Sequence, residues 1–176
     1  MNQEYRFGCP IEVRSCDIDT WGHVNNAVYF SYMEQARIRY MQHLGLAPDR
    51  LAKAPFIIAQ AACQYKAPVP YGMPLVIRVR VTEMRTSSFL MDYSIEDENT
   101  GRVTPALTCT HLHLRQVQVC AQVQVCAQVS VATGRSVNVA YDYAAGQSIP
   151  IPPEWRAKIE AFERGPSSEF PRVPQN

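Results

Sequence analysis

The sequence lacks a surplus of charge of either sign, because its 17 Lys and Arg residues almost balance its 16 Asp and Glu residues and leave a net charge of +1. Nucleic-acid-binding domains usually carry a strong basic excess, so no nucleic-acid partner is expected. No apolar run approaches the ~18 residues of a membrane-spanning helix, and the N-terminal stretch contains no apolar signal-peptide core. We therefore expect a soluble, cytoplasmic protein without a membrane partner.

Closely spaced cysteine pairs, of the kind that form zinc sites or redox motifs, are also absent. The six cysteines include no Cys-x-x-Cys spacing, and a disulfide framework is not expected in an intracellular chain of 176 residues. Cys109, His111 and His113 would share one face of an extended strand, but they offer only three ligands without an obvious partner loop. We interpret the cysteines as buried or inert thiols, and we expect no metal and no cofactor.

Hydrophobic residues make up 47% of the chain, and 176 residues suit one domain, with two domains as the alternative. Residues 27–44 place apolar side chains near the helical period and end before a glycine, which predicts a long helix. Residues 56–67, 74–86 and 88–97 alternate as strands do, and residues 152–164 predict a short final helix. One long early helix followed by several strands indicates an α+β fold, with the helix packed on an antiparallel sheet.

The stretch QVQVCAQVQVCA repeats a six-residue unit twice, which is too short and too few for a solenoid. From Ala106 to Val131 the chain has no Gly, Pro, Asn or Asp, and one strand of that length would reach ~85 Å. A domain of this size has a radius of gyration of only about 15–16 Å. We therefore expect an insertion at about 104–130 within a single domain over 1–164, followed by a flexible tail at 165–176.

The residues with the clearest chemistry lead into the long helix. Asp19 lies just before the predicted helix start, where the helix dipole favours a negative charge. Free backbone N–H groups at that end can hold a developing oxyanion, so a carboxylate beside them suits acyl transfer, as nucleophile or as general base. Gly22 allows a positive φ or a close approach to a ligand. Taken singly, the residues also have a structural interpretation, because Asp19 could cap the turn and Asn25 or Asn26 could cap the helix.

The arrangement of these residues is specific. The run RSCDIDTWGHVNNAVY, which starts at Arg14 and is followed by Glu34-x-x-Arg37, resembles the 4-hydroxybenzoyl-CoA thioesterase-like family of hotdog-fold acyl-CoA thioesterases. Residues 65–102 and 131–156 resemble that family's central strands and its closing strand. The resemblance implies a hotdog fold, in which an antiparallel β-sheet wraps a long central helix.

The resemblance also implies roles for individual residues. The catalytic carboxylate corresponds to Asp19, and the backbone N–H that polarises the thioester carbonyl falls at or near Asn26. Glu34 is the rival, because a second branch of hotdog thioesterases uses a Glu on this helix; we interpret it mainly as an ion-pair partner of Arg37 near a dimer interface. Some relatives have a second polar side chain where this chain has Trp21, so a mechanism needing that group is not expected. The expected catalytic residues are Asp19, Asn26, His23 and Glu34, and the expected substrate-binding residues are Gly22, Asn25, Tyr29 and Met33.

The resemblance implies hydrolysis of acyl-CoA to a free acid and CoA, in a homodimer or homotetramer whose sites draw residues from two chains. Acyl carrier protein thioesters are the close alternative, because the same site would accept their pantetheine arm. A hotdog hydratase places its Asp and His in a different motif, and the intact Asp19 argues against a non-catalytic acyl-CoA-binding protein. Lys66, Arg85 and Arg102 are the candidate contacts for CoA phosphates.

Overall fold

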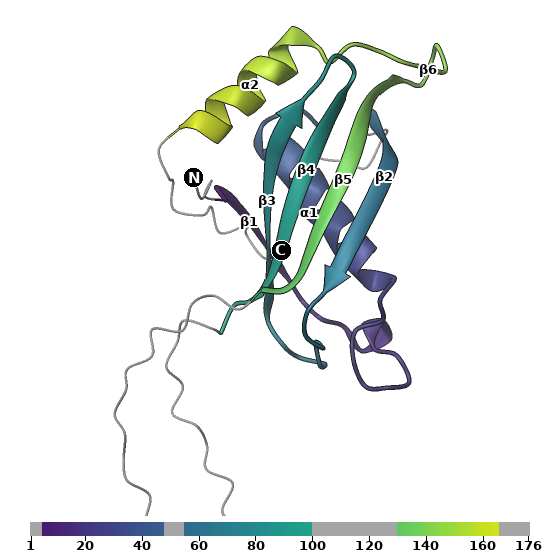
Figure 1. Ribbon diagram of the computed structural model, residues 1–176, viewed down its shortest axis with the longest axis vertical. Coiled ribbons are helices and arrows are strands. Elements are labelled where there is room, and N and C mark those ends of the chain that lie inside the picture. Colours follow the sequence, from purple (N-terminus) through teal and green to yellow (C-terminus); the bar gives the residue numbers. More distant parts are fainter. Residues whose placement is uncertain (1–4, 48–54, 100–129, 166–176) are drawn as a thin grey trace, which may run out of the picture.

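The computed structural model describes residues 5–47, 55–99 and 130–165 (Figure 1). The elements in chain order are β1 (Phe7–Ile11), the 3-10 turn η1 (Ser15–Asp17), α1 (Val28–His43), β2 (Phe56–Tyr65), β3 (Leu75–Met84), β4 (Ser88–Asp97), β5 (Ser130–Asp142), β6 (Gln147–Ser148) and α2 (Pro153–Arg164). The predicted long helix, the three predicted strands that follow it and the final helix are all present. Neither α-helix in the described ranges is long and apolar enough to cross a membrane.

The strands form one sheet in the spatial order β1-β3-β4-β5-β2, and the short β6 pairs with the end of β5. Every neighbouring pair in this sheet is antiparallel. Helix α1 lies across one face of the sheet, and α2 lies on the side of β3, away from β2 (Figure 1). These contacts confirm the predicted α+β architecture of a long helix against an antiparallel sheet.

The alternation of the central strands places apolar side chains against α1, because successive strand residues point to opposite faces. The buried side chains on this face of β3 and β4 are Leu75, Ile77, Val79, Phe89, Met91, Tyr93 and Ile95. The buried side chains of α1 are Tyr29, Tyr32, Met33, Ala36, Arg37, Tyr40 and Met41. Each fully buried Leu or Ile contributes about 1.5–3 kcal/mol, so this layer accounts for much of the stability.

Gly134 of β5 lets α1 approach the sheet closely. A Cβ atom at this position would collide with the Sδ atom of Met33 and would crowd the backbone oxygen of Ala62. Gly134 does not have a positive φ, so the requirement is for space rather than for backbone freedom. The Met33 side chain of α1 can therefore pack directly on β5.

Two predictions fall on residues outside the described ranges. The expected insertion at about 104–130 and the expected tail at 165–176 lie outside them, apart from Ser130 and Gly165. Strands β4 and β5 are paired neighbours, with Glu96 opposite Ser130, so the expected insertion falls within the connection of a hairpin. The insertion, the tail and the single domain over 1–164 stay predictions.

Candidate active site

A tight loop before α1 carries Asp19. Gly22 donates its N–H to the Asp19 carbonyl oxygen at 3.1 Å, and its φ of 83° is the left-handed conformation that favours glycine. Asp19 Oδ1 accepts the backbone N–H of Trp21 at 2.8 Å and that of His23 at 3.4 Å, as in an Asx turn. Asp19 Oδ2 accepts no hydrogen bond from the residues that the structure describes. The loop therefore orients the carboxylate through one oxygen and leaves the other available.

Asp17 anchors the loop to the start of the helix. Its side chain is 2% exposed, and it accepts hydrogen bonds from Arg14 Nη2 at 2.8 Å and from the Tyr32 hydroxyl at 2.9 Å. The hydrogen bonds from the Arg14 side chain lower the pKa of the Asp17 carboxyl to about 2. The Asp17 backbone oxygen accepts the Asn25 N–H at 2.9 Å. Asp17 is thus a structural residue that fixes the position of Asn25.

At the helix start, the backbone N–H of Asn26 has no acceptor among the residues that the structure describes. Asn25 Oδ1 accepts the Ala27 N–H at 2.9 Å, and the Asn25 carbonyl oxygen accepts the Val28 N–H at 2.9 Å. Within the described part of the chain, the Asn26 N–H donates to no acceptor. In a trans peptide the N–H points opposite to the preceding carbonyl, so the Asn26 N–H points away from the helix body. The helix dipole adds partial positive charge there, which suits this group to hold a negative oxygen.

A pocket of about 320 Å³ includes Asn26, and Tyr29, Tyr65 and Lys66 also line it. The Tyr29 and Tyr65 rings meet edge to face, with centroids 5.0 Å apart. The Tyr65 hydroxyl donates to the Asn26 carbonyl oxygen at 2.8 Å. Asp19 does not line this pocket in the single chain. The pocket is therefore built on the helix start and the end of β2, next to the loop that carries the carboxylate.

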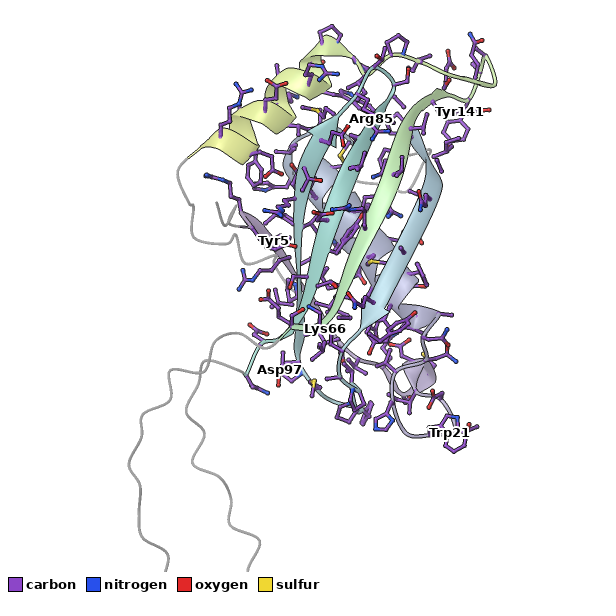
Figure 2. The ribbon with its side chains drawn as sticks, in the orientation of Figure 1. Tyr5, Trp21, Lys66, Arg85, Asp97 and Tyr141 are labelled. Carbon is purple, nitrogen blue, oxygen red and sulfur yellow. The ribbon has the colours of Figure 1, made fainter. Side chains whose placement is uncertain are left out.

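The cations expected to contact phosphates lie at different places. Figure 2 shows Lys66 and Trp21 toward one end of the molecule and Arg85 at the other. Lys66 lines the pocket, whereas Arg85 pairs with Glu83 at 2.7 Å. Arg102 lies outside the described residues. Of the two expected phosphate contacts that can be placed, Lys66 is the one near the helix start.

The structure gathers most of the predicted site residues but not all. Those around the loop and the helix start are Asp19, Gly22, His23, Asn25, Asn26 and Tyr29. Met33 lies deeper, 1% exposed and packed over Gly134. The predicted ion pair between Glu34 and Arg37 is absent from the described part of the chain. Arg37 belongs to the buried stripe of α1 and donates from Nη1 to the Tyr93 hydroxyl at 3.3 Å, whereas Glu34 is exposed.

Tyr65 is the residue of this site that sequence patterns do not predict. It is the last residue of β2, and strand alternation gives the face on which its ring lies. The partner of its hydroxyl, the Asn26 carbonyl oxygen, lies 39 residues away in the sequence. The only sequence signal is an aromatic residue near the end of the strand predicted at 56–67, just before Lys66.

Within residues 5–47, 55–99 and 130–165, no three His, Cys, Asp or Glu side chains are grouped so that they could hold a metal ion. Cys109, His111 and His113 lie outside these ranges. Burial raises the pKa of the Cys9 thiol to about 11, so this cysteine stays protonated at neutral pH.

A family profile and known proteins match parts of this chain in sequence. The sequence profile of the thioesterase-like superfamily matches residues 13–159. The chloroplastic acyl-acyl carrier protein thioesterase ATL3 of Arabidopsis thaliana is 25% identical over 87 residues, which cover 48% of this chain and 46% of that protein. The uncharacterized protein YsmA of Bacillus subtilis (strain 168) is 28% identical over 89 residues, which cover 51% of this chain and 60% of that protein. The chain thus spans about half the length of these curated relatives.

A solved thioesterase structure has a fold similar to that of this chain. A thioesterase from Thermus thermophilus, complexed with coenzyme A and Zn, is similar to this chain with a TM-score of 0.68 and 28% identity. The similarity covers 94% of this chain and 99% of that chain. The antiparallel sheet with its two helices is therefore the hotdog-like fold of the thioesterases.

Proposed function

The chain belongs to the thioesterase-like superfamily, and we propose that it is a thioester hydrolase that cleaves acyl-CoA to a free carboxylic acid and CoA. The observation that carries this proposal is the Asn26 N–H at the positive end of α1, which has no acceptor among the described residues and belongs to a residue that lines a pocket beside the Asp19 loop. A thioester carbonyl oxygen placed there would meet a donor that is already oriented. The similar Thermus thioesterase is complexed with coenzyme A, which supports a CoA thioester as the substrate.

The reaction needs a hydrogen-bond donor that stabilises the developing oxyanion, and a nucleophile or a general base that activates water. As the thioester carbon becomes tetrahedral, its oxygen gains negative charge and accepts the Asn26 N–H; one such donor commonly contributes ~10²–10³ in rate. Asp19 either attacks this carbon, so that the C–S bond breaks and water hydrolyses the resulting anhydride, or it takes a proton from an attacking water. Both routes consume one water and release a carboxylic acid and the CoA thiol.

The remaining predicted residues have supporting roles in this proposal. Gly22 allows the turn that orients Asp19, and Asn25 holds the helix start. His23 is exposed beside the loop, where it would position substrate or water. Tyr29 forms the wall of the pocket, and Met33 would contact the acyl group only at its deepest point. Glu34, exposed on α1, is the alternative carboxylate.

We also propose that two copies pair along β2 and that the partner covers the pocket. β2 is the last strand of the sheet, and within the described residues only β5 pairs with it. Ile57 is 36% exposed and Ile58 is 41% exposed on this strand, and an exposed apolar edge favours pairing with another strand. A native mass of two or four times 19.9 kDa, measured by light scattering, supports a homodimer or homotetramer, and the mass of one chain contradicts it.

An acyl carrier protein thioester is the second candidate substrate, because ATL3 carries that activity in its name. Both substrates end in the same pantetheine arm, so the same helix start would serve both. A panel of matched acyl-CoA and acyl carrier protein thioesters distinguishes them by the ratio of kcat/KM values.

We expect Asp19→Asn to lower kcat at least a hundredfold in a thiol-release assay over a panel of acyl-CoAs, because it removes the nucleophile or base while keeping the shape. Asp142→Asn is the matched control. Asp142 Oδ1 also accepts two backbone N–H groups in a turn, from Ala144 at 2.8 Å and Ala145 at 3.1 Å, but this turn follows β5. Asp142→Asn should keep wild-type turnover.

The same assay separates the two carboxylates. Near-wild-type turnover of Asp19→Asn together with an inactive Glu34→Gln would move the chemistry to Glu34. A wild-type protein that hydrolyses neither acyl-CoA nor acyl carrier protein thioesters would contradict the proposed function.

A further inference from the structure

We propose that Tyr65 is a positioning residue for thioester hydrolysis, whose hydroxyl anchors Asn26 through its carbonyl oxygen and so holds the Asn26 backbone in place at the helix start. The inference rests on the proposed function and adds a residue to its machinery. It starts from the hydrogen bond of 2.8 Å that the Tyr65 hydroxyl donates to the Asn26 carbonyl oxygen. Tyr65 would act through Asn26, without touching the reacting atoms.

The hydrogen bonds that Asn25 makes at the helix start are local in the sequence. The Asn25 N–H is held by Asp17, and Asn25 in turn accepts the N–H groups of Ala27 and Val28. All of these bonds link residues within one short segment, so they fix its internal shape without tying it to the sheet. Among the described residues, Tyr65 supplies the side-chain bond that ties this segment to a strand.

The ring and the hydroxyl of Tyr65 have separable effects. The ring packs against Tyr29 at a centroid distance of 5.0 Å and an interplanar angle of 72°, which seats the first turn of α1 on the end of β2. The hydroxyl restrains the peptide between Asn26 and Ala27, whose N–H is held by Asn25 Oδ1 on its other side. Removing the hydroxyl alone therefore loosens the orientation of Asn26 while the packing of the ring remains.

A donor that acts on the developing oxyanion is most important in the transition state, so a loss of its orientation lowers kcat more than it changes KM. A single hydrogen bond contributes about 0.5–1.5 kcal/mol, which corresponds to a roughly two- to tenfold effect. We expect Tyr65→Phe to lower kcat by roughly three- to tenfold, with KM within about twofold of wild type and little change in Tm.

Tyr143→Phe is the matched control. The Tyr143 hydroxyl also donates to a backbone oxygen, that of Phe56 at 3.4 Å, and this contact lies at the start of β2 instead of its end. The two tyrosines are similarly exposed, at 44% for Tyr65 and 47% for Tyr143. Tyr143→Phe should therefore leave kcat unchanged. An unchanged kcat in Tyr65→Phe, or an equal fall in both variants, would overturn the proposal.

The Asn26 backbone amide gives a second, independent measurement. In ¹H–¹⁵N spectra, Tyr65→Phe should shift the Asn26 amide signal and Tyr143→Phe should not; an unmoved Asn26 signal in Tyr65→Phe would overturn the positioning role. If wild-type protein hydrolyses no thioester, the proposed function fails, and the amide signal still decides whether Tyr65 holds the helix start.

Discussion

At each end of α1 a tyrosine hydroxyl donates a hydrogen bond to a carboxylate, but the two carboxylates lie in different surroundings. Near the start of the helix, the Tyr32 hydroxyl donates to Asp17 at 2.9 Å, and near its end the Tyr40 hydroxyl donates to Glu163 at 2.6 Å. The bonds from the Arg14 side chain lower the pKa of the Asp17 carboxyl to about 2, whereas burial raises the pKa of the Glu163 carboxyl. A tyrosine–carboxylate pair therefore does not fix the charge of the carboxyl; its other neighbours do.

The two ends also differ in what they leave open. At the end of the helix, α2 packs against α1. The centroid of the Phe162 ring lies 5.7 Å from that of the Tyr40 ring and 5.4 Å from that of the His43 ring. Glu163 also accepts the Val81 N–H at 2.8 Å, which ties α2 to β3. At the start of the helix, Asn26 lines a pocket. One end of the helix is thus closed by packing, and the other has a backbone N–H without an acceptor among the described residues.

Asp17→Asn should produce the largest loss of stability at the open end. The amide cannot accept all the hydrogen bonds that Arg14 and Tyr32 donate, so we expect a loss of about 2 kcal/mol and a Tm lower by roughly 4–8 °C. The wild-type contribution of Asp17 is present above its ordinary pKa of 3.8 and is lost as the pH falls through about 2. Thermal unfolding at neutral pH and at low pH checks both statements. A variant as stable as wild type at neutral pH would remove the contrast between the two ends.

Glu163→Gln should have a smaller effect, of the opposite sign. The raised pKa means that stability from Glu163 is present below its ordinary pKa of 4.5 and is lost as the pH rises through the raised value. A Gln keeps the oxygen that Tyr40 and Val81 contact and removes a charge that burial disfavours. At pH 8 we expect the variant to match wild type or exceed it by up to about 1 kcal/mol, with unchanged thioesterase turnover. A clear loss of stability at pH 8 would mean that the ionised carboxylate is stabilising.

The fold could be predicted largely from periodicity. The helix predicted at 27–44 is observed as Val28–His43, and the strand predicted at 88–97 is observed as Ser88–Asp97. Both segments are long, and each has one regular spacing of apolar residues, the helical period in α1 and alternation in β4. The side chains at these positions face the same buried layer, so the local pattern and the tertiary packing favour the same structure.

The site could be predicted only in part. Asp19, Gly22 and Asn25 follow from turn and capping chemistry, which is local in sequence. Arg37 could not be placed, because a charged residue near Glu34 predicts a surface ion pair, whereas the helix turns it toward Tyr93. Tyr65 could not be predicted because its contact with the helix start depends on how β2 meets α1.

The most direct test of the open helix start compares two substitutions at Asn26. Asn26→Pro removes the backbone N–H of the residue that precedes the N-cap Ala27, and no hydrogen bond of the described residues depends on that N–H, whereas Asn26→Ala removes the exposed side chain and keeps the N–H. Measured by acyl-CoA hydrolysis, kcat should fall ~10²–10³-fold in Asn26→Pro and stay within a few-fold of wild type in Asn26→Ala, with both proteins folded. Equal kcat values in the two folded variants would show that the free N–H of the helix start takes no part in the reaction.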